Sequence, residues 1–217
     1  MRMAGAIFDL DGTLLDSMPV WQRFGALYLE SRGIGAPPGL TETLKTMSLP
    51  QAAAFFREAF GFEETQEELL AQFGELLARQ YRERVSLKGY VLPFLCRLRS
   101  AGVRMCVATA TDKAAAGAAL ERLGAAEFFD FILCCADVGC GKESPAIYLA
   151  ALERLGTAKA QTVVFEDALH AARTAKAAGF PVVGVFDASS AGDREALTRL
   201  ADRYIESFEE WEWEKDV

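Results

Sequence analysis

The stretch AGAIFDLDGT, residues 4–13, joins a short apolar run to two aspartates, Asp9 and Asp11. Residues 4–8 have strand length and are apolar throughout, which is typical of a strand buried on both faces of a parallel sheet. Side chains two positions apart in an extended chain point the same way, so both aspartates can face one cleft. Two ionised carboxylates about 4 Å apart repel by roughly 4 kcal/mol at an effective dielectric near 20. The pair therefore needs a shared proton or a cation, and a divalent metal suits it; a solvated Asp-Gly turn is the alternative.

The same arrangement of strand and helix recurs along the chain. Further apolar runs of strand length are residues 103–108, 131–135, 162–165 and 181–186. The segments between the later runs are rich in Ala and Leu and end at glycine, as helices do; they are residues 113–123, 145–155 and 169–178. This alternation predicts an α/β fold with a doubly wound parallel sheet covered by helices on both faces.

The first two apolar runs are too far apart in the sequence for a single crossover helix, so a domain is inserted between them. The insertion reads as helices over residues 20–31, 51–60 and 66–84, separated by glycines and prolines. We therefore predict an α-helical cap domain, residues 17–85, within a Rossmann-like core formed by residues 1–16 and 86–217. The acidic end of the chain, residues 207–217, contains two tryptophans and is predicted to form a final helix or an ordered arm.

Composition narrows the classes of function. Of the 217 residues, 31 are acidic and 23 basic, and the net charge of −8 would repel nucleic acid and anionic membranes. The apolar run near the N-terminus is too brief for a signal peptide or a membrane span. Five cysteines without a CxxC pair or nearby histidines indicate reduced thiols rather than a zinc site. We expect a cytoplasmic protein, and we expect its only histidine, His170, to be an ordinary surface residue.

Polar residues follow the other predicted strands where each one ends. They are Thr109-Ala110-Thr111, Gly141-Lys142 in the loop after the third run, and Glu166-Asp167. Each of these residues also has a structural explanation when it is taken alone. The threonines could cap a helix, the lysine could be solvated, and the acids could lie in the first turn of a helix, where the helix dipole favours them. In open parallel sheets, however, ligands bind outside the carboxyl ends of the strands. All of these groups are expected at that edge, where hydroxyls and N–H groups suit phosphate and the acids suit Mg²⁺.

Together, DLDGT at residues 9–13, Thr109, Lys142 and Glu166-Asp167 resemble the four motifs of the haloacid dehalogenase superfamily. The helical insertion directly after the first motif is similar to the cap of its β-phosphoglucomutase and phosphoglycolate phosphatase branch. GKESP at residues 141–145 matches the G-K-x-x-P of that branch. The resemblance implies phosphoryl transfer through an aspartyl-phosphate with Mg²⁺ as cofactor.

The resemblance also implies roles for individual residues. Asp9 would be the nucleophile and Asp11 the general acid and base, with Thr109 and Lys142 completing the catalytic set. The implied phosphate-binding residues are Gly12, Thr13, Thr109, Ala110 and Lys142. The implied metal ligands are Asp9, Asp11 through its backbone carbonyl, Glu166 and Asp167.

A phosphatase acting on a small phosphorylated metabolite is the expected function, and a β-phosphoglucomutase-like sugar phosphomutase is the alternative. Trp21 stands where the mutases have a catalytic histidine and Leu49 where they have a phosphate-binding arginine, which favours the hydrolase. Trp21 and Lys45 are candidate substrate contacts from the cap. A receiver-like signalling domain or an inactive scaffold is less consistent with two acids on the first strand and with all motif acids present. We expect a monomer or weak homodimer.

Overall fold

The computed structural model describes residues 3–45 and 47–211. The chain divides into two compact units, Met1–Ser17 with Ser86–Val217, and Met18–Val85. The first is called the core unit and the second the helical unit. Each is described by itself.

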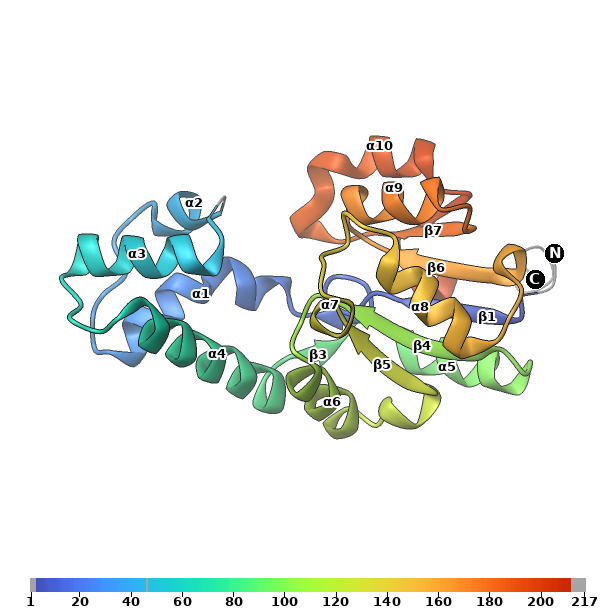
Figure 1. Ribbon diagram of the computed structural model, residues 1–217, viewed down its shortest axis with the longest axis horizontal. Helices are drawn as coiled ribbons and strands as arrows, with labels where there is room; N and C mark the ends of the chain where they lie inside the picture. Colours follow the sequence, from blue (N-terminus) through green and yellow to red (C-terminus); the bar gives the residue numbers. More distant parts are fainter. Residues whose placement is uncertain (1–2, 46, 212–217) are drawn as a thin grey trace. The chain divides into compact units, whose positions relative to one another are not determined.

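The core unit is built on a parallel sheet (Figure 1), which has six strands in the described residues, in the order β5-β4-β1-β6-β7-β8. The strands are β1 Gly5–Phe8, β4 Arg104–Thr109, β5 Phe131–Cys134, β6 Thr162–Glu166, β7 Val182–Val185 and β8 Arg203–Ile205. From β1 the strands are added in chain order first on one side, as β4 and β5, and then on the other, as β6, β7 and β8. A cleft is expected at the carboxyl end of β1, where the order changes side. The predicted doubly wound parallel core with a helical insertion is confirmed.

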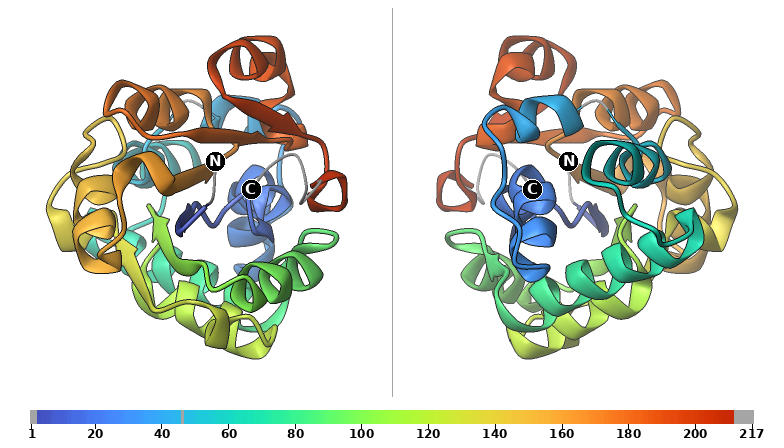
Figure 2. Two further views of the ribbon diagram at one scale, coloured as in Figure 1. Left: turned by 90° about the vertical axis from the view of Figure 1, so that its right-hand side faces the viewer. Right: turned by 90° about the vertical axis from the view of Figure 1, so that its left-hand side faces the viewer.

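Helices cover both faces of this sheet. They are α5 Val91–Ser100, α6 Lys113–Arg122, α7 Cys135–Val138, α8 Ala146–Leu155, α9 Leu169–Ala177 and α10 Arg194–Leu200. On one face, buried strand residues such as Ile7 and Val164 pack against α8, α9 and α10. On the other face, Phe8 and Phe165 stack at 4.6 Å and meet Phe94 of α5. The views of Figure 2 show α9 and α10 on the opposite side of the strands from α5.

Several element boundaries differ from the sequence prediction. The strand predicted over residues 131–135 stops at Cys134, because Cys135 opens the short helix α7 and Asp137 caps that turn. Strand β8 and helices α5 and α10 were not predicted, since none stood out as an apolar run or a regular helical pattern. Part of the predicted C-terminal arm is a 3-10 turn, Phe208–Glu210, followed by the buried Trp211. Residues 212–217 of that arm lie outside the described residues.

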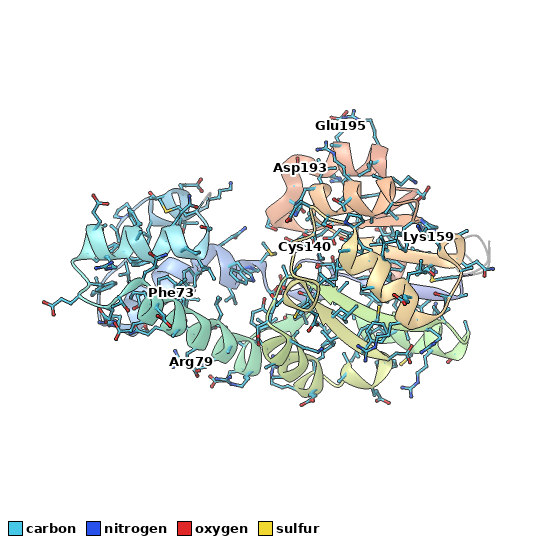
Figure 3. All side chains as sticks on the ribbon, in the orientation of Figure 1. Phe73, Arg79, Cys140, Lys159, Asp193 and Glu195 are labelled. Carbon is cyan, nitrogen blue, oxygen red and sulfur yellow. The ribbon has the colours of Figure 1, made fainter. Side chains whose placement is uncertain are left out.

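The helical unit contains α1 Met18–Ser31, α2 Leu40–Leu44, α3 Leu49–Phe60 and α4 Gln66–Glu83. Ser48 and Thr65 begin α3 and α4 with capping boxes, each closed by a side chain three residues on. The unit has a core of its own, in which Tyr28 and Phe56 pack edge to face and Phe73 lies fully buried against both. Figure 3 shows the position of Phe73 on α4. The short helix α2 was missed because glycines and prolines precede it.

Two short strands hold the points where the chain leaves and re-enters the core unit. β2, Leu15–Asp16, pairs antiparallel with β3, Ser86–Leu87. The backbone N–H of Lys88 extends this pairing by donating to the carbonyl of Leu14 at 2.9 Å. The pairing of β2 with β3 therefore fixes Lys88 beside the loop that follows the first motif.

No helix within residues 3–45 and 47–211 is long and apolar enough to cross a membrane. All five cysteines lie in these ranges and are free. His170 is exposed on α9, as expected.

Candidate active site

The carboxyl ends of β1, β4 and β6 bring the predicted motif residues together. Asp9 directly follows β1, Thr109 ends β4, and Glu166 ends β6 with Asp167 next to it. Lys142 comes from the loop after α7. All five are buried, although charged side chains are rarely buried without partners. This burial does not fit a solvated lysine at Lys142. Glu166 and Asp167 are not first-turn acids either, because α9 begins at Leu169.

Lys142 joins two of the acids. Its ammonium donates to Asp9 Oδ1 in a close contact and to Glu166 Oε2 at 2.8 Å. Burial alone would lower the pKa of Lys142, but the charges of Asp9 and Glu166 outweigh it and hold that pKa well above its usual value. Tyr148 of α8 adds a buried hydroxyl that donates to Glu166 Oε2 at 3.2 Å. Glu166 is thus fixed between an ammonium and a phenol.

The acids exceed the positive charge available to them. Oxygen atoms of Asp9, Glu166 and Asp167 all lie within 4.8 Å of one another. Burial, reinforced by Glu166, raises the pKa of Asp9 to about 6 despite the opposing effect of Lys142. Burial, with the charges of Asp9, Glu166 and Asp187, raises the pKa of Asp167 to about 9. One ammonium does not balance this cluster, and a divalent cation would.

Asp9 has an oxygen left for such a cation. Oδ1 accepts from Lys142, whereas Oδ2 is buried and has no hydrogen-bond partner in the described part of the chain. A buried carboxylate oxygen without a partner is costly unless a ligand satisfies it. Hard carboxylate oxygens are the ligands that Mg²⁺ and Ca²⁺ prefer. The donor set therefore fits a hard divalent metal.

Asp11 is half-buried and held by two hydroxyl groups. Ser17 Oγ donates to its Oδ1 and Thr111 Oγ1 to its Oδ2, each at 2.6 Å. Bonds of this kind hold a carboxylate in one orientation. Asp11 contributes no carboxylate oxygen to the acid cluster of the described residues. Its role as a metal ligand through its backbone carbonyl stays a prediction.

The turn after Asp11 supports Asp167. Thr13 Oγ1 donates to Asp167 Oδ1 at 3.1 Å, so this hydroxyl is engaged with an acid of the cluster. Gly12 has a φ of +84°, and a Cβ at this position would lie 2.5 Å from Asp167 Oδ2. Glycine is needed here because of both the left-handed backbone and the close approach. The predicted binding of phosphate by Gly12 and Thr13 stays a prediction.

At the end of β4, Thr109 Oγ1 accepts from the N–H of Thr111 at 3.0 Å. The alternative that the threonines cap the next helix is wrong. Asp112 caps that helix by accepting hydrogen bonds from the backbone N–H groups of Ala114 and Ala115. Thr109 is fully buried and Ala110 is exposed at the strand end. Their predicted contacts with phosphate remain untested by the structure.

The two cap candidates belong to the helical unit. The indole N–H of Trp21 donates to Tyr81 Oη at 2.9 Å, so its single donor is used inside that unit. Lys45 is exposed at the end of α2. Neither is assigned to a substrate by these contacts.

Some residues of the site were not identified from the sequence. Ser17, Tyr148 and Lys88 each bond a motif residue or its turn, and Asp187 pairs with Lys88. No local pattern marks Tyr148, Lys88 or Asp187, because their contacts join segments that only the tertiary fold brings together. Ser17 is six residues from Asp11, but its bond to that carboxylate was not predicted. Thr111 was noted for its hydroxyl, but its bond to Asp11 was not foreseen.

Residues 3–179 match the family model described as haloacid dehalogenase-like hydrolase. A phosphorylated carbohydrates phosphatase of Thermotoga maritima is 31% identical over 181 residues, which cover 82% of each chain. A fructose-1-phosphate phosphatase of Escherichia coli is 32% identical over 85% of this chain and 97% of that one. The crystal structure of a β-phosphoglucomutase-type protein of T. maritima superposes with a TM-score of 0.82 at 28% identity, covering 94% of both chains.

Proposed function

Because this chain belongs to the haloacid dehalogenase-like hydrolase family, we propose that it is a Mg²⁺-dependent phosphatase of small phosphorylated carbohydrates, with Asp9 as its nucleophile. Its branch is that of the β-phosphoglucomutases, phosphoglycolate phosphatases and CbbY proteins, and its class is the phosphoric monoester hydrolases. The family resemblance noted in the motifs is confirmed, and a receiver-like domain is no longer a candidate.

The observation that carries the proposal is the buried Asp9 carboxylate, with Oδ1 on Lys142 and Oδ2 without a hydrogen-bond partner. A nucleophile must keep an oxygen available, and a metal site needs oxygens that no protein donor has taken. Asp9, Glu166 and Asp167 would hold Mg²⁺. The chemistry that Mg²⁺ supplies when bound is charge screening between the Asp9 carboxylate and the anionic phosphate.

The reaction would have two steps, formation of an aspartyl-phosphate and its hydrolysis. Asp9 attacks phosphorus, the bond from phosphorus to the leaving oxygen breaks, and protonated Asp11 gives that oxygen its proton. Water then attacks the aspartyl-phosphate and passes a proton back to Asp11, while the bond from Asp9 to phosphorus breaks and phosphate leaves. The hydroxyls of Ser17 and Thr111 hold the Asp11 carboxyl group in position for both steps. Thr109, Ala110 and Lys142 would bind the phosphate oxygens.

The names of two relatives, a phosphorylated carbohydrates phosphatase and a fructose-1-phosphate phosphatase, support a sugar or polyol phosphate as substrate. Hydrolysis is favoured over a mutase reaction because Trp21, which replaces the mutase histidine, carries only an N–H donor. That donor is bound to Tyr81. The helical unit, residues 17–85 in the sequence prediction, would serve as the cap, with Trp21 and Lys45 as candidate substrate contacts. The expected cytoplasmic location stays a prediction.

The test is turnover of p-nitrophenyl phosphate with Mg²⁺, followed by a panel of hexose, hexitol and glycolate phosphates. We expect EDTA to abolish turnover. Asp11→Asn should lower kcat by about 10²–10⁴-fold, because the leaving oxygen loses its proton donor. Turnover unaffected by EDTA, or an Asp11→Asn variant as active as the wild type, would contradict the proposal.

Phosphorus NMR with hexose 1-phosphate separates the two reactions of the branch. A phosphatase releases free phosphate, whereas a mutase accumulates hexose 6-phosphate. Accumulation of the 6-phosphate would reverse the choice of hydrolase while leaving the aspartyl-phosphate chemistry intact.

A further inference from the structure

Lys88 is a charged residue close to the site to which the phosphatase chemistry assigns no role. It follows β3, and its backbone N–H bonds Leu14 within the loop after the first motif. Its side chain is 17% exposed and pairs with Asp187, which is 6% exposed at the end of β7. The pair therefore joins three segments that lie far apart in the sequence.

The hydrogen bonds of this pair are fully used. An ammonium has three N–H donors. Those of Lys88 reach the carbonyl of Gly12 at 2.7 Å, Asp187 Oδ2 at 3.2 Å, and the carbonyl of Phe186 in a close contact. The other oxygen of Asp187 accepts from the backbone N–H and the hydroxyl of Ser189, at 2.9 and 2.6 Å. Lys88 is thus held in one position from several directions.

Gly12 transmits that position to the acid cluster. Its N–H donates to Leu15 at 2.9 Å and its carbonyl accepts from Lys88. Its Cα lies so close to Asp167 that a Cβ would come within 2.5 Å of Oδ2, and the neighbouring Thr13 donates to Oδ1. A displacement of this turn would therefore displace both supports of the Asp167 carboxylate. The same turn carries the Asp11 carbonyl.

We propose that Lys88 and Asp187 are positioning residues of the metal site, which fix the Gly12 turn against Asp167. A buried ion pair contributes little to stability compared with an apolar pair of similar size, so stability alone does not explain its presence. Residues that orient metal ligands from behind typically change metal affinity by 10-fold to 100-fold when they are replaced. Lys88 reaches the proposed ligand Asp167 through Gly12, and Asp187 holds Lys88 in place.

This inference rests on the proposed metal site, and its test measures metal binding rather than turnover. Removing Lys88 alone would leave Asp187 buried and unpaired, so the variant is Lys88→Met with Asp187→Asn. The asparagine oxygen can still accept from Ser189. Calorimetric titration with MgCl₂ should give a dissociation constant about tenfold or more above the wild-type value. Thermal unfolding in EDTA should show a melting temperature close to that of the wild type.

Lys176→Met with Asp202→Asn is the matched control, because it removes another Lys–Asp pair, which is 34% and 52% exposed. Asp202 accepts a hydrogen bond from the backbone N–H of Val182, the first residue of β7, at the opposite end of the strand from Asp187. The control variant should therefore bind Mg²⁺ as tightly as the wild type. A second variant, Lys88→Met with Asp187→Leu, replaces the ion pair with two apolar residues. It should weaken Mg²⁺ binding to the same extent.

Mg²⁺ affinity within twofold of the wild type in either folded Lys88 variant overturns the inference, and the proposed function still stands. The inference is also overturned if replacing the control pair weakens Mg²⁺ binding as much as replacing the Lys88 pair does, in a protein whose wild type needs Mg²⁺ to hydrolyse phosphate esters. Absence of Mg²⁺-dependent turnover in the wild type is instead the failure of the proposed function.

Discussion

Asp9→Asn should abolish turnover and at the same time stabilise the metal-free protein. Asp9, the proposed nucleophile, is a buried carboxylate beside two other acids, and Lys142 compensates only part of this charge. Asparagine has almost the shape of a protonated aspartate and carries no charge. Its oxygen can still face Lys142, and its NH₂ can face the neighbouring acids, which only accept hydrogen bonds.

The magnitude follows from the pKa of Asp9, which burial and Glu166 raise from 3.8 to about 6. A pKa raised by this much corresponds to a loss of about 3 kcal/mol in the free energy of unfolding when Asp9 ionises. The pKa is raised on folding, so the associated stability is fully present below pH 3.8 and lost as the pH rises through about 6. At pH 8 the variant should therefore be more stable by about 3 kcal/mol, and at pH 4 the difference should nearly vanish.

Thermal unfolding by circular dichroism in EDTA, from pH 4 to pH 8, measures this difference. For a chain of this length, about 3 kcal/mol corresponds to a rise in Tm of roughly 6–12 °C. Asp16→Asn, which replaces an exposed acid of β2, is the control and should leave Tm unchanged at every pH. Added MgCl₂ should raise the Tm of the wild type more than that of Asp9→Asn, because the variant lacks a carboxylate proposed to bind the metal.

An Asp9→Asn variant that melts below the wild type in EDTA at pH 8 would refute this reasoning. A stabilisation of the same size at pH 4 and pH 8 would refute it as well, since it could not come from the charge of Asp9.

Lys142→Met should lower the free energy of unfolding in EDTA by about 3–5 kcal/mol, because Asp9 and Glu166 lose their shared ammonium in a buried site. MgCl₂ should recover part of this loss in a thermal melt, and a variant as stable as the wild type in EDTA would show that the ammonium does not balance the acids. Gly12→Ala should weaken Mg²⁺ binding by at least about tenfold in calorimetry, since its Cβ would lie 2.5 Å from Asp167 Oδ2 on a backbone with φ +84°. Wild-type affinity in this variant would mean that the turn does not support Asp167.

Much of the fold could be predicted because it depends on local patterns. Continuous apolar runs marked β1, β4, β5, β6 and β7, and glycines marked the ends of α6, α8 and α9. The order of strands and helices then limited the topology to a doubly wound sheet, which places the ends of β1, β4 and β6 at one edge. The motif residues at those ends could be named for the same reason.

Boundaries and unpatterned elements could not be predicted in this way. Strand β8 is three residues long and pairs with β7 only at the edge of the sheet, so no apolar run announces it. Cys135 has the apolar character of a strand residue, but the Asp137 carboxylate turns the chain there into α7. A local competition between hydrogen bonds decided that position, and hydropathy does not register it.

The sequence by itself determined which chemical groups this protein has and the order in which strand ends present them: two acids, a threonine, a lysine and two more acids. Only the tertiary structure decided which group meets which. Lys142 reaches Asp9 across 133 residues, Thr111 reaches Asp11 across 100, and Lys88 reaches Asp187 across 99. Contacts of this length depend on how whole elements pack, whereas sequence patterns report only the few residues on either side. For that reason the acids could be listed beforehand, but the buried, unpartnered oxygen of Asp9 could not.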